Sequence, residues 1–165
     1  MLRKKIAVLV FSVLLSACGY HLRGSSTEVA QEIKSIYWDG GTLQLREQLK
    51  GVLGSSASKL ADSPEKAGVT VKILNEDFRH RVLSLSSRGR SNEVELDYQL
   101  DYELYKEGKL LLERQPLRLR REYFNDQQDI IAKDNEERVI RDEMYQQAIQ
   151  SILSRARLEL QAASK

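Results

Sequence analysis

The fold of this chain is decided by residues 93–120, EVELDYQLDYELYKEGKLLLERQPLRLR. In the first half of this stretch apolar residues alternate with acidic and other polar ones, so an extended strand would have one apolar and one polar face. Such a pattern is typical of a sheet that is covered on one face only. The apolar positions are Val94, Leu96, Tyr98, Leu100, Tyr102 and Leu104.

Glu107 and Gly108 predict a tight turn after this strand, because a two-residue loop ending in glycine suits a hairpin. Such a loop places apolar residues opposite each other on one face and acids opposite arginines on the other. A slip of one residue would place acids opposite leucines, so the charges favour one register. The expected pairs are Tyr98 with Leu117, Leu96 with Leu119, Asp97 with Arg118, Glu95 with Arg120 and Asp101 with Arg114.

Three further elements are expected before this hairpin. Residues 33–38, IKSIYW, predict a short strand that ends at the glycines of residues 39–41. Thr42 can cap a helix, and residues 69–73, VTVKI, begin a second strand whose phase changes near Leu74, as at a β-bulge. The apolar positions at helical spacing in the first helix are Leu45, Leu49, Val52, Leu53 and Leu60.

A long helix is expected from Asp134 to about Leu160. Asp134 can cap it, and Glu137 stands three residues later in the position of a capping box. Apolar residues at helical spacing predict a buried stripe, with Tyr145 beside it. The stripe consists of Ile140, Met144, Ala148, Ile149, Ile152 and Ala156.

These elements predict an α+β fold of the order β-α-β-β-β-α. Two helices packed on one face of a mainly antiparallel four-stranded sheet would form a two-layer sandwich. We expect a single α+β domain over residues 32–160, followed by a frayed tail at residues 161–165.

The N-terminus has the features of a bacterial lipoprotein signal peptide. Three cations in residues 3–5 precede a short apolar run, and the run ends on the lipobox-like sequence LSAC at residues 15–18. We therefore expect residues 1–17 to be removed and residues 18–31 to form a lipidated tether. Cys18, the single cysteine, would carry a diacylglycerol and an N-acyl chain that anchor the protein to a membrane. Gly19, rather than Asp, follows it, which favours the outer membrane.

Charge and composition argue against several function classes. The chain has 26 Lys and Arg against 24 Asp and Glu, and removal of the three N-terminal cations leaves 23 against 24, a net charge of −1. A nucleic-acid binder would be strongly basic, so no nucleic acid is expected as a partner. The two histidines, His21 and His80, have no neighbours spaced for a metal site or a nucleophile relay, and no catalytic motif is present. We therefore expect a protein that is not an enzyme, with no metal and no cofactor beyond the acyl chains.

A cluster of arginines surrounds the connection between the second and third strands. Arg79, Arg81, Arg88 and Arg90 fall in a stretch without an acid between Asp77 and Glu93. Two interpretations fit this pattern. The arginines could bind phosphate groups, which guanidinium pairs with in bidentate fashion. Alternatively they form a solvated hairpin and oppose the acidic neighbouring strand.

Motifs near both ends of the chain resemble those of the LptE family. Residues 18–24, CGYHLRG, are similar to the start of mature LptE proteins. Residues 123–126, YFND, resemble an aromatic-Phe-Asp-Asn stretch of that family, and residues 132–136, AKDNE, followed by residues 143–145, EMY, match a segment near its C-terminus. The order of the expected elements also agrees with that family.

This resemblance implies a function in the assembly of lipopolysaccharide. LptE proteins plug the lumen of the outer-membrane β-barrel LptD, one to one, help it to assemble, and bind lipopolysaccharide during its delivery to the outer leaflet. The resemblance places Lys133 and either Arg88 or Arg90 in contact with lipopolysaccharide. The simpler interpretation of Lys133 is a solvated lysine before a helix cap. We expect the anchor in the outer membrane, facing the periplasm, with the domain inside the barrel lumen.

Two other functions compete with this one. The chain could be a lipoprotein subunit of another envelope lipid-transport system, in which case it would copurify with inner-membrane transport subunits rather than with a barrel. An anchored periplasmic enzyme would need convergent titratable groups in a pocket, and the sequence offers no such set.

Overall fold

The computed structural model describes residues 33–56, 58–87, 89, 91–124 and 130–163, and for residues 130–135 the backbone alone. The elements follow the order β1, α3, β2, η1, β3, β4, β5, α4. Their bounds are β1 Ser35–Asp39, α3 Leu43–Gly54, β2 Lys59–Leu60, η1 Pro64–Lys66, β3 Val69–Leu85, β4 Ser91–Lys106, β5 Lys109–Phe124 and α4 Ile130–Ala162.

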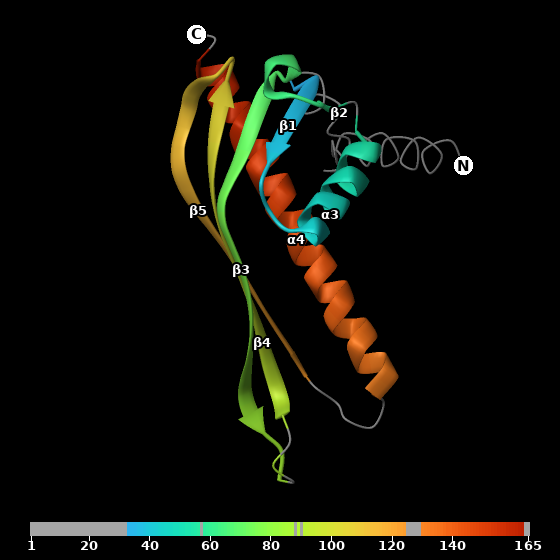
Figure 1. Ribbon diagram of the computed structural model, residues 1–165. Helices are drawn as coiled ribbons and strands as arrows, with labels where there is room; N and C mark the ends of the chain where they lie inside the picture. Colours follow the sequence, from blue (N-terminus) through green and yellow to red (C-terminus); the bar gives the residue numbers. More distant parts are fainter. Residues whose placement is uncertain (1–32, 57, 88, 90, 125–129, 164–165) are drawn as a thin grey trace, which may run out of the picture.

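The strands form one sheet in the order β2-β1-β3-β4-β5, and Figure 1 shows β1, β3, β4 and β5 side by side. β1 runs parallel to β2 and β3, whereas the long β3–β4 and β4–β5 ladders are antiparallel. The α+β class with two helices is therefore confirmed, but the expected four strands and their order were wrong. The fifth strand is β2, a two-residue strand beside Ser35 and Ile36. Leu60, which we expected in the first helix, lies in β2.

The hairpin turn at Glu107-Gly108 is confirmed, but its register changes along the strands. Glu107 and Gly108 have φ values of 51° and 75°, as a type I′ turn requires, and Lys106 pairs with Lys109. Register shifts on either side of Leu104 then move the pairing by two residues, so that Tyr98 lies opposite Leu119 rather than Leu117. From Tyr102 to Glu93 the shift is even, so the side chains of this part of the ladder keep their predicted faces.

The β-bulge expected near Leu74 is present as a register shift between Ile73 and Asn75. The N-cap of the first helix is also confirmed, since the Thr42 hydroxyl accepts a hydrogen bond from the Leu45 N–H at 3.3 Å. The predicted start of α4 was wrong: the helix begins at Ile130, so Asp134 lies inside it. Residues 130–133 are Ile, Ile, Ala and Lys, none of which breaks a helix, so the helix extends past the capping signal.

The core lies between the sheet and the two helices. α4 crosses one face of the sheet along its length, and the shorter α3 lies beside it (Figure 1). The apolar face of β4 is fully covered, because Leu96, Tyr98 and Leu104 have no exposed surface. The predicted stripe of α4 is buried from Met144 to Ala156, whereas Ile140 is half-buried.

Candidate functional site

The residues predicted to act at the site lie largely outside the described part of the chain. Cys18 belongs to residues 1–32, which the structure does not describe, and Arg88 and Arg90 are likewise outside the described residues. Lys133 lies in the first turns of α4, where only the backbone is described. What the structure does describe is the end of the sheet from which residues 86–90 connect β3 to β4. We call this the distal end: His80–Leu85 of β3, Ser91–Leu96 of β4 and Arg121–Phe124 of β5.

Arg79 and Arg81, the two described members of the arginine cluster, are paired with acids. The Arg79 Nε lies 2.5 Å from an Asp77 carboxylate oxygen, and an Arg81 Nη lies 2.9 Å from Glu95 on the neighbouring strand. The Arg81 contact fits the second interpretation, in which the arginines oppose the acidic strand, whereas Arg79 pairs with an acid of its own strand. Both side chains remain about two-thirds exposed, so each guanidinium keeps donors that face solvent.

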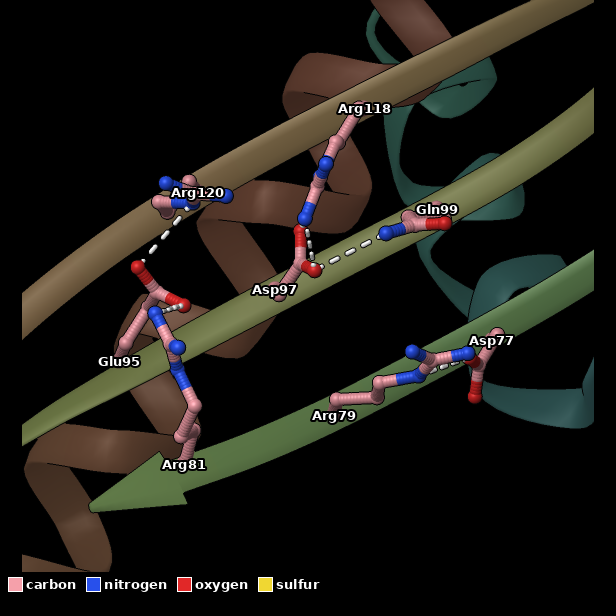
Figure 2. Close-up of polar contacts among 8 residues, drawn as sticks. All are labelled: Asp77, Arg79, Arg81, Glu95, Asp97, Gln99, Arg118 and Arg120. Carbon is pink, nitrogen blue, oxygen red and sulfur yellow. Dashed lines mark hydrogen bonds and ion pairs between the residues drawn. The ribbon is translucent and has the colours of Figure 1, made fainter. Parts of the chain in front are cut away.

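A lattice of ion pairs covers the sheet face that points away from α4 (Figure 2). Glu95 is held between Arg81 of β3 and Arg120 of β5, at 2.9 and 3.1 Å. Asp97 receives two hydrogen bonds from Arg118, at 2.7 and 2.6 Å, and Arg114 pairs with Asp101 at 2.5 Å. All three predicted acid–arginine pairs therefore form, although the strand register is shifted. Long arginine side chains reach the acids diagonally across the ladder.

The acids of this lattice are buried although they lie on a face without a covering helix. The Glu95 and Asp97 side chains are 4% and 9% exposed, while the arginines above them are 48–64% exposed. The hydrogen bonds from Arg118 lower the pKa of Asp97 from 3.8 to about 2 despite the opposing effect of burial. The face therefore presents guanidinium donors above neutralised carboxylates, a surface suited to hydrogen bonding with a polar partner.

An aromatic cluster lies on the opposite face, under α4. The rings of Phe78, Tyr98 and Tyr145 lie 5.0–5.9 Å apart between centroids. The Arg141 guanidinium lies 4.2 Å from the centre of the Phe78 ring, as in a cation–π contact. The Tyr98 hydroxyl donates to Glu76 at 3.1 Å, and burial raises the pKa of this phenol.

Glu137 of α4 contacts the distal end through polar groups. It accepts hydrogen bonds from the Tyr123 hydroxyl at 2.9 Å and from Arg141 at 2.8 Å, and the His80 Nε2 lies 3.9 Å from it. We call Phe78, His80, Tyr123, Glu137 and Arg141 the Glu137 cluster. Glu137 was expected to cap the helix, and this expectation was wrong.

Several apolar side chains at and near the distal end are exposed. Leu85 of β3 and Phe124 of β5 are 64% and 69% exposed, and Val139 of α4 is 52% exposed. Val82 and Leu83 are also exposed, at 44% and 40%. These residues lie near exposed arginines, so the distal end offers apolar surface and cations together.

The structure adds residues that sequence reasoning did not assign. Two of the side chains around Glu137, Tyr123 and His80, belong to strands, so the pattern of the helix could not show that they meet it. A helical acid that precedes Arg141 by four residues signals only an ordinary i,i+4 pair.

In the described part of the chain, no helix is both long and apolar enough to cross a membrane, and no three His, Cys, Asp or Glu side chains are grouped to hold a metal ion.

Comparison with known proteins identifies relatives along most of the chain. A family model, LptE: Lipopolysaccharide-assembly, matches residues 30–156. The LPS-assembly lipoprotein LptE of Pectobacterium atrosepticum is 27% identical over 156 residues, which cover 88% of this chain and 80% of that protein.

Two solved structures have a similar fold. The solution NMR structure of an uncharacterized lipoprotein B from Nitrosomonas europaea is 26% identical, with a TM-score of 0.64, over 88% of this chain and 93% of that one. The crystal structure of the rare lipoprotein B from Shewanella oneidensis is 23% identical, with a TM-score of 0.62, over 78% of this chain and 98% of that one. The resemblance inferred from the motifs near both ends of the chain is thus confirmed. Because the family model matches most of the chain, this chain belongs to the LptE family of lipopolysaccharide-assembly proteins.

Proposed function

We propose that this protein is an outer-membrane lipoprotein that plugs an LptD-type barrel and helps it to assemble. Acyl chains on Cys18 would anchor it on the periplasmic side, and its domain would occupy the barrel lumen in a one-to-one complex. It would bind lipopolysaccharide during delivery to the outer leaflet, through Lys133 and through Arg88 or Arg90. Membership of the LptE family supports this proposal.

The observation that carries the plug function is the ion-pair lattice on the sheet face away from α4. The lumen of an outer-membrane barrel is polar, so a plug needs a surface that hydrogen-bonds without bringing unpaired charge into the lumen. Arg118 and Arg120 keep exposed guanidinium groups while they neutralise Asp97 and Glu95 beneath them. Such a face can lie against polar side chains of a barrel wall at little desolvation cost.

The distal end supports the lipid-binding part of the proposal. Residues 86–90, which include Arg88 and Arg90, connect the two strands that meet there, and Lys133 precedes Glu137 by four residues in α4. Glu137 in turn contacts the distal end. Lipopolysaccharide carries phosphates and acyl chains, and the distal end combines exposed arginines with the exposed side chains of Leu85 and Phe124.

Copurification tests the proposed function. The tagged full chain is expressed in its own host, extracted in mild detergent, and its stoichiometric partners are identified. We expect a large outer-membrane barrel at one to one. Inner-membrane transport subunits without a barrel would instead support the alternative, a subunit of another envelope lipid-transport system.

Charge reversal tests the proposed lipid contacts. Lys133→Glu and the double variant Arg88→Glu/Arg90→Glu should each weaken binding of purified lipopolysaccharide roughly tenfold, as expected for the loss of about 1.4 kcal/mol. Copurification of the barrel should be unchanged. Binding equal to that of the unaltered protein in both variants would remove these residues from the site.

A further inference from the structure

Part of β3 forms an edge of the sheet. β1 pairs with β3 only along Val69–Lys72, and beyond that range β4 is the only described strand that pairs with it. The loop before α3 covers the next residues, because Glu76 accepts hydrogen bonds from the N–H and the hydroxyl of Thr42 at 2.6 and 2.9 Å. Along Asp77–Val82 no described strand lies on the side opposite β4 (Figure 1). We call Asp77–Val82 the edge segment.

The backbone of the edge segment is regular. It pairs with β4 in an unbroken register, from Asp77 opposite Gln99 to Val82 opposite Val94, and the register shifts of this ladder lie before and after it. In an antiparallel ladder every second residue directs its N–H and C=O at the partner strand, and the residues between direct theirs to the other side. A regular edge of this length, about that of an average strand, is a template for the addition of a further strand.

The two outer strands of the long antiparallel ladders differ in their protection against such pairing. β5 contains Pro116, which has no N–H to donate, and Arg114, Arg118 and Arg120 lie close to it. Proline and charge are common means by which a sheet edge is kept from pairing with another chain. The edge segment contains no proline, and its Val82 is 44% exposed. The backbone of β5 is therefore protected against strand addition, whereas that of the edge segment is not.

The two faces of the edge segment define the kind of strand that fits beside it. Arg79 and Arg81 lie on the face with the ion-pair lattice (Figure 2) and are about two-thirds exposed, whereas Phe78 and Val82 lie on the α4 face. β4 already matches this pattern on the inner side, with acids opposite the two arginines and apolar residues opposite Phe78 and Val82. A strand on the outer side needs the same alternation, because cross-strand neighbours share a face.

The arginines of the edge segment can still bind acids of a further strand. Arg79 pairs with Asp77 and Arg81 with Glu95, but a guanidinium has five N–H donors, so each keeps donors that face solvent. Carboxylates are the strongest side-chain acceptors for these donors. The charge of the edge segment therefore selects an acidic partner rather than excluding every partner.

We propose that the edge segment binds an extended segment of a partner polypeptide that alternates acidic and apolar residues. The partner adds a strand beside β3 through main-chain hydrogen bonds, with its acids toward Arg79 and Arg81 and its apolar residues toward Val82. This inference goes beyond the proposed function, because it requires neither lipopolysaccharide nor the residues proposed to bind it.

The probe is a synthetic peptide with the sequence of residues 93–100, EVELDYQL, which already fits the inner side of the same strand. The full chain is kept in mild detergent, and hydrogen exchange of single backbone amides is measured by NMR with and without the peptide. We expect slower exchange at every second amide of the edge segment and unchanged exchange in β4 and β5. This pattern would show that the peptide adds to the outer side of β3.

Two modified peptides test whether main-chain hydrogen bonds hold the added strand. Each carries N-methyl groups on alternate amides, one peptide on each of the two sets. Only one of them should lose binding, about tenfold, because a strand directs every second amide at its neighbour.

Charge reversal on the protein tests the choice of an acidic partner. Arg79→Glu should weaken binding of the unmodified peptide about fivefold, since acids then oppose acids. Lys72→Glu is the matched control, because it makes the same charge change at an exposed position of the same strand where β1 already occupies the edge. Binding by this variant should equal that of the unaltered protein.

Several results would overturn the proposal. These are no binding of the peptide, equal binding of both N-methylated peptides, and equal binding by Arg79→Glu. Faster exchange in β4 on addition of the peptide would show that the peptide displaces β4 instead of adding to β3. Slow exchange in the edge segment that depends on protein concentration without peptide would assign this edge to a second copy of the chain. Copurification of a barrel and binding of lipopolysaccharide are measured separately, so the proposed function stands or fails independently.

Discussion

Single residues in the ion-pair lattice make the stability of this protein depend on pH. The pKa of Asp97 is lowered to about 2 by Arg118, against 3.8 for an ordinary aspartate. Between these values the unfolded chain binds more protons than the folded one, so stability contributed by Asp97 is complete above pH 3.8 and is lost as the pH falls through about 2. The free energy of unfolding of the unaltered protein should therefore fall as the pH is lowered from about 4 to about 2.

Asp97→Asn tests this dependence. The variant should lose stability at neutral pH, because the charge-assisted hydrogen bonds from Arg118 become weaker. Its stability should vary less than that of the unaltered protein between pH 4 and pH 2, measured by urea unfolding at each pH. Parallel curves for the two proteins over this range would contradict the assignment of the shift to Asp97.

Glycine is required at position 40 because the backbone there has a positive φ and because a side chain would not fit. Its φ is +84°, and a Cβ built there would lie 2.7 Å from the Ile73 carbonyl oxygen. Gly40→Ala should therefore destabilise the fold by at least about 1–3 kcal/mol, measured by thermal or urea unfolding. Gly51→Ala is the control: a Cβ there meets nothing within 4 Å, and alanine favours the helix, so that change should not destabilise.

At the scale of elements, the β4–β5 hairpin contains a residue that its turn does not favour. Glu107 has a φ of 51°, in the left-handed region that asparagine and glycine tolerate better. Glu107→Asn should raise the free energy of unfolding by about 0.5–1 kcal/mol, measured by urea unfolding, because it relieves this cost. Glu107→Val should have the opposite effect, and equal stabilities of the two variants would contradict a type I′ turn.

At the scale of the whole molecule, the two layers present different surfaces. One is the ion-pair lattice, and the other is the solvent side of the helices. Arg79→Glu changes the lattice face, and Lys50→Glu makes the same charge change on the exposed side of α3. Under the proposed function, Arg79→Glu should reduce barrel copurification about fivefold, because it removes an exposed guanidinium and places an unpaired acid beside Asp77, whereas Lys50→Glu should leave it unchanged. A loss confined to Lys50→Glu would place the helices, rather than the lattice face, against the barrel.

The sequence by itself determined the features that depend on local periodicity. Alternation in β4 predicted which residues face the helices, and all six are buried. Glu107-Gly108 predicted the turn, and the stripe from Met144 to Ala156 predicted the buried face of α4. The acid–arginine pairs were also predictable, because an even register shift leaves each side chain on its face.

Only the tertiary structure decided the features that depend on distant partners. β2 has two residues, too few for a periodic signal, and exists because β1 offers it an open edge. The register shifts beside Leu104 depend on how β4 and β5 pair with each other, which the sequence of neither strand shows by itself. Glu137 looked like a helix cap, yet its carboxylate binds Tyr123 because folding brings the end of β5 against α4. The helix starts at Ile130, so Glu137 stands well inside it, and a partly buried carboxylate there is stabilised by the donors that converge on it.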